Sequence, residues 1–291
     1  MIYPAAITPR RADEVAIDIA AALELIDFLE SHGVDGITLL GSTGEFLHYT
    51  PEDRTRLAAM AAKRCHVPVL VNVSHSTLDG AVALAQQAVE AGVAGVLIMP
   101  PNYFRYTQES IRAYFLEFVA QVKAPVYLYN IPQFTTELKT STAIDLLATG
   151  LFAGIKDSSG SWENFVELQK AAPKVFTGAD AMYSRMLRSG ACGAISGVAS
   201  VIPELMVAID RLAHAGEDTS VLDAQVAAFA DRAMAFPFPI GLREAAAVRG
   251  LKAGPNATPL GREECVRMEE FRGWFREWLP EVLLNLRQRA P

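Results

Sequence analysis

Cysteine is scarce in this sequence of 291 residues. The three cysteines, Cys65, Cys192 and Cys265, are an odd number, lie far apart and form no C-x-x-C pair. This pattern excludes a disulfide-rich secreted fold and a zinc ribbon, whose cysteines occur in closely spaced sets. We therefore expect a protein of a reducing compartment, the cytoplasm.

An excess of basic residues and a long apolar run are also missing. Lysine and arginine number 26 against 33 aspartates and glutamates, so that the net charge is −7 and the isoelectric point is near 5.3. This charge repels polyanions, and we expect no nucleic acid partner. No apolar run reaches the roughly 18 residues that span a bilayer. The first arginines follow the first apolar stretch, the reverse of a signal peptide. The sequence thus predicts a soluble protein without a membrane partner.

Motifs for metals and nucleotides are absent as well. The five histidines form no H-x-x-x-H pair, so we expect no metal site. The first apolar run is followed by Thr8–Arg11 rather than by a G-x-G-x-x-G turn. A dinucleotide-binding open sheet, which carries that turn, is therefore disfavoured.

The sequence does contain a regular alternation of short apolar runs with longer amphipathic segments. The runs are rich in β-branched residues and bounded by Gly, Pro, Asn or Ser, as buried parallel strands are. They are Ile2–Thr8, Gly36–Leu40, Pro68–Val73, Ala94–Met99, Pro125–Tyr129, Phe152–Lys156, Val175–Thr177 and Ala191–Ser196. Eight such strand–helix units predict an α/β protein with a (β/α)8 TIM barrel.

The amphipathic segments carry helix signals. Residues Asp13–Ser31 repeat apolar side chains with a period near 3.6, and Thr50 and Thr107 are typical helix N-caps. After residue 202 only helical patterns remain: Pro203–Ala215, Ser220–Ala235, Arg243–Leu251 and Gly261–Arg289. We therefore divide the chain into a barrel, residues 1–202, and residues 203–291, the final barrel helix with a C-terminal helical extension packed on the barrel. The aromatic stripe of the last helix is interpreted as packing.

Reactive side chains stand at the predicted carboxyl ends of several strands, where barrels of this type form their active sites. Lys156 ends one apolar run and Tyr129 ends the preceding one. A desolvated amine is a nucleophile toward carbonyls. The turn Gly41–Glu45 offers backbone N–H groups and two hydroxyls that suit a carboxylate. Taken singly, a surface lysine and a packing tyrosine are the commoner interpretations, whereas together these residues favour carbonyl chemistry on a small anion.

These motifs also carry a family resemblance. Gly-Ser-Thr-Gly-Glu at 41–45, Tyr-Asn-Ile-Pro at 129–132 and Gly-Ile-Lys-Asp at 154–157 follow one another at matching spacing. The sequence resembles the dihydrodipicolinate synthase / N-acetylneuraminate lyase superfamily of pyruvate-dependent class I aldolases over nearly the whole chain. The resemblance implies a lyase that is commonly a homotetramer, a dimer of dimers.

The resemblance also implies roles for individual residues. Lys156 is implied to form a Schiff base with C2 of pyruvate or a 2-keto acid, and Tyr129 to move protons at that centre. Ser42 and Thr43 are implied to hold the pyruvyl carboxylate, with Ser42 in a proton relay with Tyr129. Tyr103 matches the relay tyrosine that a neighbouring subunit supplies. No metal or other cofactor is implied, because the iminium is the electron sink.

Departures from the family pattern bear on the substrate. Synthases of the lysine pathway carry an arginine where this sequence has Phe134, and sialate lyases carry an Asp-Glu pair where it has Asp180 and Ala181. Asp180, with Ser158 and Ser196, is able to bind the hydroxyls of a shorter sugar acid. The sequence therefore predicts cleavage of a 2-keto-3-deoxy sugar acid, or a related 4-hydroxy-2-keto acid, to pyruvate and an aldehyde.

Several alternatives stay open at this point. Dihydrodipicolinate synthase, N-acetylneuraminate lyase and a keto-deoxy acid dehydratase share the scaffold. A non-catalytic keto-acid-binding regulator is the alternative of another class. His75, after the third predicted strand, is either a substrate-shaping residue or a loop histidine bonded to backbone, and Glu45 is either a base or a partner of buried groups.

Overall fold

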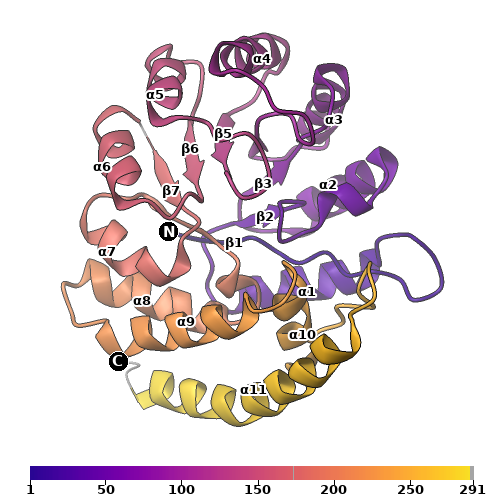
Figure 1. Cartoon of the computed structure of the whole chain (residues 1–291), viewed down its shortest axis with the longest axis vertical. Coiled ribbons are helices and arrows are strands. Elements are labelled where there is room, and N and C mark those ends of the chain that lie inside the picture. The colour runs from indigo at the N-terminus through magenta and orange to yellow at the C-terminus, as the bar shows by residue number, and fades with distance from the viewer. Residues whose placement is uncertain (173, 289–291) are drawn as a thin grey trace.

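The computed structural model describes residues 1–172 and 174–288. Eight parallel strands form one sheet in the order β1-β8-β7-β6-β5-β4-β3-β2. Their bounds are β1 Ile2–Pro4, β2 Ile37–Leu39, β3 Val69–Asn72, β4 Gly95–Ile98, β5 Val126–Asn130, β6 Gly154–Asp157, β7 Val175–Thr177 and β8 Gly193–Ser196. The two end strands meet through a parallel bridge between Ala5 and Thr38, and the N–H of Ala6 donates to the carbonyl of Thr38 at 2.9 Å. The predicted (β/α)8 barrel is confirmed (Figure 1).

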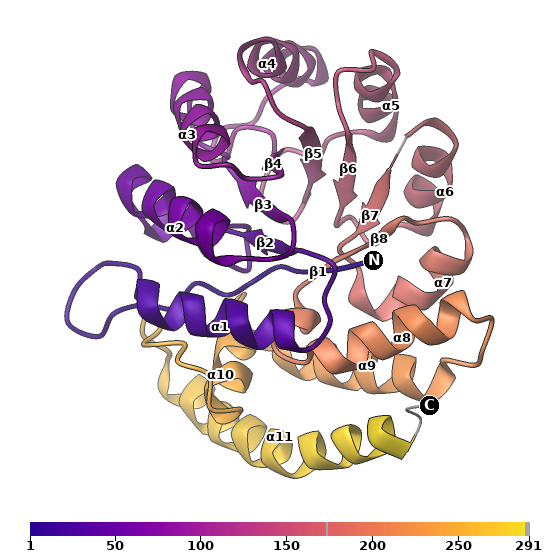
Figure 2. The same ribbon diagram turned by 180° about the vertical axis from the view of Figure 1, so that it is seen from behind.

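Helices surround the ring of strands on the outside, as both views show (Figure 1, Figure 2). The α-helices of the barrel are α1 Ile19–Ser31, α2 Pro51–Arg64, α3 Leu78–Glu90, α4 Gln108–Gln121, α5 Thr140–Ala148, α6 Trp162–Ala171, α7 Tyr183–Arg188 and α8 Pro203–His214. The caps expected at Thr50 and Thr107 are confirmed, because each side chain accepts a hydrogen bond from the N–H three residues later.

The predicted helix at 13–31 begins too early. Helix α1 starts at Ile19, and its N-cap is Asp18, whose side chain accepts from the N–H of Ala21. The preceding residues form an exposed loop in which Val15 is 68% exposed. The capping aspartate outweighs the apolar periodicity, because an N-cap residue leaves the helical backbone conformation.

The C-terminal segment is helical as predicted, with α9 Ser220–Ala233, α10 Ile240–Val248 and α11 Arg262–Gln288. Helix α10 lies three residues earlier than expected; Arg289, the predicted end of the last helix, lies outside the described residues. Helix α11 runs along α8, α9 and α10 (Figure 1). Its aromatic stripe packs on Phe229, whose ring stacks on Trp278 at 5.8 Å between centroids.

Aromatic rings fill the barrel interior at the amino ends of the strands. The ring of Phe176 lies 5.6 Å from that of Tyr3 and 5.9 Å from that of Tyr127, between centroids. Gly36 has no room for a side chain, since a Cβ there would lie 2.0 Å from the Tyr3 ring. The interior is thus packed on this side, and the large cavity described below opens at the other end.

Candidate active site

Lys156 and Tyr129 lie side by side on neighbouring strands. They are register partners in the β5–β6 pair, and their exposed fractions are only 5% and 2%. The Lys156 Nζ lies 4.3 Å from the centroid of the Tyr129 ring. The two residues that sequence motifs placed at adjacent strand ends are therefore in direct contact, and both are buried.

The next residues of the same two strands hold this edge together. Asn130 donates from Nδ2 to Asp157 Oδ1 at 2.8 Å, and the Ser159 hydroxyl donates to Asp157 Oδ2 at 2.6 Å. The Asn130 side-chain carbonyl accepts from the N–H of Leu138 at 3.1 Å. Burial raises the pKa of Asp157, while the bonds from Ser159 and Asn130 lower it. This network holds the backbone that carries Lys156 and Tyr129 on both strands.

A turn after β2 brings the hydroxyls of Ser42 and Thr43 to the same end of the barrel. Ser42 and Tyr129 share a hydrogen bond of 3.2 Å in which either hydroxyl is able to donate. Thr43 is buried and lines the cavity that contains Lys156. Leu40 and Glu45, at either end of the turn, both adopt positive φ, 57° and 50°. Two non-glycine residues in the left-handed region are a local strain that the rest of the structure must hold in place.

Glu45 pairs with Arg243 of helix α10. Arg243 Nη1 donates to Glu45 Oε2 and to the carbonyl of Thr8, each at 2.8 Å, and Nη2 donates to the carbonyl of Ala253 at 2.6 Å. Arg243 is only 1% exposed. The sequence interpretation missed Arg243, since an arginine in an amphipathic helix is ordinarily at the surface. Of the two interpretations of Glu45, the ion pair supports a partner of buried groups.

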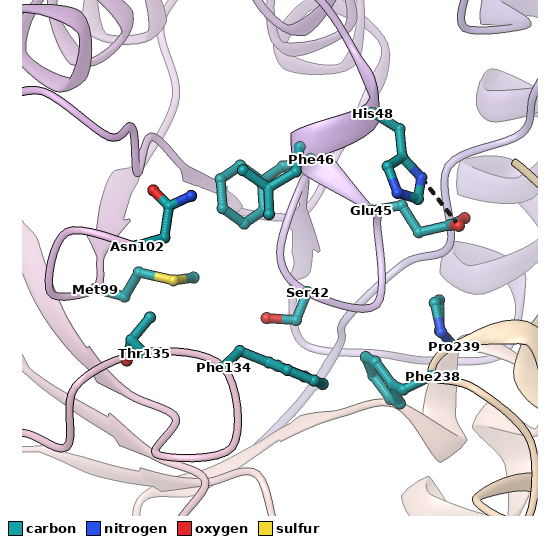
Figure 3. A pocket seen from close by; sticks show the side chains of 11 residues that line it. Ser42, Glu45, Phe46, His48, Met99, Asn102, Phe134, Thr135, Phe238 and Pro239 are labelled. Carbon is teal, nitrogen blue, oxygen red and sulfur yellow. Dashed lines mark ion pairs between the residues drawn. The ribbon is translucent and has the colours of Figure 1, made fainter. Parts of the chain in front are cut away.

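The Lys156 side chain lies in a cavity of about 580 Å³. The predicted residues that line it are Lys156, Tyr129, Thr43, Ser158, Asp180 and Phe134. At position 178 the cavity wall has room only for glycine, because a Cβ there would lie 2.1 Å from Ser158 Oγ and 3.3 Å from Lys156 Cε. Ser42 instead lines a neighbouring pocket of about 140 Å³, where Phe134 and Phe238 lie near it (Figure 3).

Asp180 is, with Lys156, one of two charged side chains among the described residues that line the large cavity. Its Oδ2 accepts from the N–H of Val198 at 2.9 Å, whereas its buried Oδ1 has no hydrogen-bond partner among the described protein atoms. Burial raises the pKa of Asp180, and the N–H of Val198, the Ser196 hydroxyl and the charge of Lys156 lower it. Asp180 therefore has free acceptor capacity in the same cavity as Lys156.

Besides Ser42 and Glu45, three more predicted residues lie outside this cavity. Ser196 is fully buried at the end of β8, where its hydroxyl accepts from the N–H of Ala199 at 2.9 Å. Tyr103 is 88% exposed, with a φ of 77°, and lines neither pocket. His75 sits in a loop and contacts Thr77, whose N–H donates to His75 Nδ1 at 3.2 Å. The structure thus assembles most of the predicted site within this chain, and leaves Tyr103 facing outward.

Two further properties concern the described residues, 1–172 and 174–288. Within them no group of three or more His, Cys, Asp and Glu side chains is placed to hold a metal ion. No helix formed by these residues is both long and apolar enough to cross a membrane.

Comparisons with known proteins agree with this geometry. The profile of the dihydrodipicolinate synthetase family matches residues 1–272. The chain is 35% identical over 239 residues to an uncharacterized DapA-like lyase of Chloroflexus aurantiacus, covering 79% of this chain and 80% of that protein. It is 34% identical over 209 residues to the 4-hydroxy-tetrahydrodipicolinate synthase of Salinibacter ruber, covering 69% of each chain.

Solved structures of the same fold include YagE, a prophage protein of Escherichia coli K12, in complex with pyruvate. Its TM-score is 0.87 at 26% sequence identity, and the match covers 95% of this chain and 97% of that one. They also include the 2-keto 3-deoxygluconate aldolase of Picrophilus torridus, at a TM-score of 0.80 and 25% identity, covering 89% of this chain and 97% of that one. Because the family profile matches residues 1–272, nearly the whole sequence, the chain belongs to the dihydrodipicolinate synthetase family.

Proposed function

We propose that this lyase cleaves a 4-hydroxy-2-keto acid, of which a 2-keto-3-deoxy sugar acid is one example, to pyruvate and an aldehyde through a Schiff base on Lys156. The observation that carries the proposal is the contact of the buried Lys156 amine with Tyr129, whose hydroxyl is bonded to Ser42. A nucleophile beside a proton carrier that is itself oriented by a third group is the arrangement that covalent catalysis requires.

In the proposed cycle, the Lys156 amine attacks the C2 carbonyl, Tyr129 donates a proton to the departing oxygen, and water leaves, forming an iminium. Tyr129 takes the proton of the C4 hydroxyl as the C3–C4 bond breaks, and the electron pair of that bond moves into the iminium to give an enamine. The aldehyde departs, a proton is added at C3, and water hydrolyses the resulting imine to release pyruvate and the amine. The iminium accepts the electrons, so that this cycle uses no metal or other cofactor.

The hydroxyls of Ser42 and Thr43 are proposed to bind the carboxylate of the 2-keto acid, and Asp180 to accept from the C4 hydroxyl. Supporting this, Thr43 and Asp180 line the cavity of Lys156, and Asp180 Oδ1 has no other partner in the described chain. A relative of the same fold is named a 2-keto 3-deoxygluconate aldolase, and another was solved with pyruvate.

Synthesis of 4-hydroxy-tetrahydrodipicolinate is the second candidate, because several relatives carry that name. Its second substrate brings a carboxylate that needs a cationic partner. Phe134 stands where the family pattern has arginine, and Lys156 is the only cation among the described residues that line the large cavity. This favours the aldolase.

A homotetrameric assembly in the cytoplasm, with Tyr103 crossing a subunit interface, completes the proposal. Supporting it, Tyr103 and Phe104 are 88% and 64% exposed and pack on each other, which leaves an apolar surface at the mouth of the barrel. Sedimentation of the wild-type chain as a tetramer, and of a Tyr103→Asp variant as smaller species, is the expected result. A wild-type monomer would contradict the assembly.

The test of the chemistry is borohydride trapping with pyruvate followed by peptide mass spectrometry. We expect a reduced pyruvyl adduct on Lys156 and none in a Lys156→Arg variant, which keeps the positive charge but does not form an imine. Exchange of the pyruvate methyl protons, followed by NMR, then separates an enzyme from a regulator that only binds. A folded wild-type protein without an adduct on Lys156 would refute the mechanism.

A further inference from the structure

The outer wall of the Lys156 cavity is apolar, and this bears on which aldehyde the enzyme releases. Beyond the residues assigned to the pyruvyl group and the C4 hydroxyl, the wall comes from four separate segments. Its large members are Phe134 after β5, Met182 after β7, Met234 after α9, and Phe238 before α10. Phe134 and Met234 are 51% and 47% exposed, although both face the cavity of a buried lysine.

The two phenylalanines form one continuous apolar surface. Their ring centroids lie 5.6 Å apart, and the pair lines both the Lys156 cavity and the neighbouring pocket beside Ser42 (Figure 3). That pocket adds Phe46 and Met99 to the apolar wall, and its polar members are Ser42, Glu45, His48, Asn102 and Thr135. A substrate held on Lys156 that extends toward the opening therefore meets aromatic and thioether groups.

Polar capacity for a distal chain is small by comparison. Among the described residues that line the cavity, Lys156 and Asp180 are the only charged ones. Gln133 and Ser158 line it too, but Gln133 Nε2 already donates to the carbonyl of Ser158 at 3.2 Å, which leaves the Ser158 hydroxyl as the main neutral polar group for a distal chain. A polyhydroxylated chain loses its bonds to water on entry, and each hydroxyl left without a partner weakens binding. An aryl or alkyl chain instead gains by covering the exposed rings.

We infer that the distal group of the substrate is apolar, so that the aldehyde released from the 4-hydroxy-2-keto acid carries an aryl or alkyl chain rather than a polyol. This inference rests on the proposed function and narrows it to one class of substrate. Phe134, Phe238 and Met234 are the residues that set the preference. They contact the part of the substrate beyond C4 and leave the pyruvyl group to the residues around Lys156.

The experiment measures kcat/KM for condensation of pyruvate with benzaldehyde and hexanal, against glyceraldehyde and erythrose, each per concentration of free aldehyde. We expect the apolar aldehydes to be favoured about 10-fold or more, the discrimination that a hydrophobic pocket supplies. Met234→Gln, nearly equal in size, and Phe134→Asn should each lower that ratio several-fold. The matched control is Met60→Gln, at a methionine of α2 that is 40% exposed and lines neither cavity, and its ratio should equal that of the wild type.

Borohydride trapping of pyruvate on Lys156, run on every variant, separates the possible failures. A normal adduct together with a preference for the polyol aldehydes overturns this inference and leaves the proposed function standing. A normal adduct with an unchanged aldehyde ratio in both Met234→Gln and Phe134→Asn overturns the assignment of the wall. No adduct in the wild-type protein overturns the proposed function and this inference with it.

Discussion

Two regions bring the candidate active-site residues together, and they are anchored in different ways. At the β5–β6 edge, Lys156 and Tyr129 are register partners, and the residues that follow them, Asp157 and Asn130, bond to each other across the same pair of strands. Both the reactive groups and their supports are consecutive in the sequence. Regular strand pairing therefore does most of the positioning.

The turn at 41–45 depends on a distant residue. Its Glu45 has a left-handed backbone and is held by Arg243, which is 198 positions away. Arg243 also binds the carbonyls of Thr8 and Ala253, so one guanidinium joins the first strand segment, the turn and the C-terminal segment. The comparison teaches that a residue on a strand needs little outside help, whereas a strained turn needs an anchor from elsewhere in the fold.

Removal of that anchor should have the largest effect on stability. Arg243→Met removes the buried cation of Glu45 and leaves it only the more exposed His48, whose Nδ1 lies 3.3 Å from Glu45 Oε1. Breaking a buried pair in this way costs about 3–5 kcal/mol of unfolding free energy. Denaturant unfolding monitored by circular dichroism measures it. The control is Arg64→Met, which removes an exposed pair with Asp27 and should leave the unfolding midpoint unchanged. A midpoint for Arg243→Met equal to the wild type would show that the turn holds its shape without the anchor.

The contact that joins the two regions is the hydroxyl pair of Tyr129 and Ser42. Tyr129→Phe keeps the ring against Lys156 and removes only the hydroxyl, so we expect kcat to fall about 10²-fold or more with the melting temperature little changed. Tyr127→Phe, on the same strand but in the packed interior, should retain activity. Wild-type turnover by Tyr129→Phe would exclude this tyrosine as the proton carrier.

The support of the β5–β6 edge by the side-chain amide of Asn130 is tested by removing that amide. Asn130→Ala removes the donor to Asp157 and the acceptor for the N–H of Leu138, and leaving buried groups unpaired costs about 1–3 kcal/mol. Unfolding free energy should fall by that amount, and pyruvate trapping on Lys156 should slow. Ser159→Ala, which removes the other bond to Asp157, should cost less because this position is only partly buried. Equal losses in both variants would argue against Asn130 as the main support.

A small change in stability, of the opposite sign, is expected from a side chain that neither region supports. Burial raises the pKa of Asp180, so the folded protein binds this proton more tightly than the unfolded chain does. Ionisation therefore destabilises the fold above the raised pKa, and the penalty shrinks as the pH falls below it and is gone once the unfolded chain is protonated as well. Asp180→Asn should melt higher than the wild type at neutral pH, with the gap closing in acid, while turnover is lost. A gap that is independent of pH would contradict this account.

A good part of this arrangement follows from short stretches of sequence. The eight apolar runs predicted the barrel, and the residues that end two of them predicted that Lys156 and Tyr129 would meet, because neighbouring parallel strands end at the same edge. Thr50 and Thr107 marked helix starts, since a cap acts on the backbone three residues away.

The predicted start of α1 was wrong, although it also depended on short stretches of sequence. Two local signals conflict there, and the helix begins after the N-cap Asp18 rather than where the apolar period begins. Local sequence alone does not show which of two conflicting signals decides where a helix begins. It does identify the segments on which they compete.

By itself, then, the sequence determined the eight-stranded barrel, the strand ends that carry the reactive residues, and the family to which they belong. Only the tertiary structure decided that Arg243 anchors the turn, that Tyr103 faces outward, and that Phe134, Met234 and Phe238 form one wall. The physical reason is the distance along the sequence over which each interaction acts. Helix caps, strand patterns and turns act over a few residues, whereas an ion pair across 198 positions or a wall built from several segments exists only once the barrel closes.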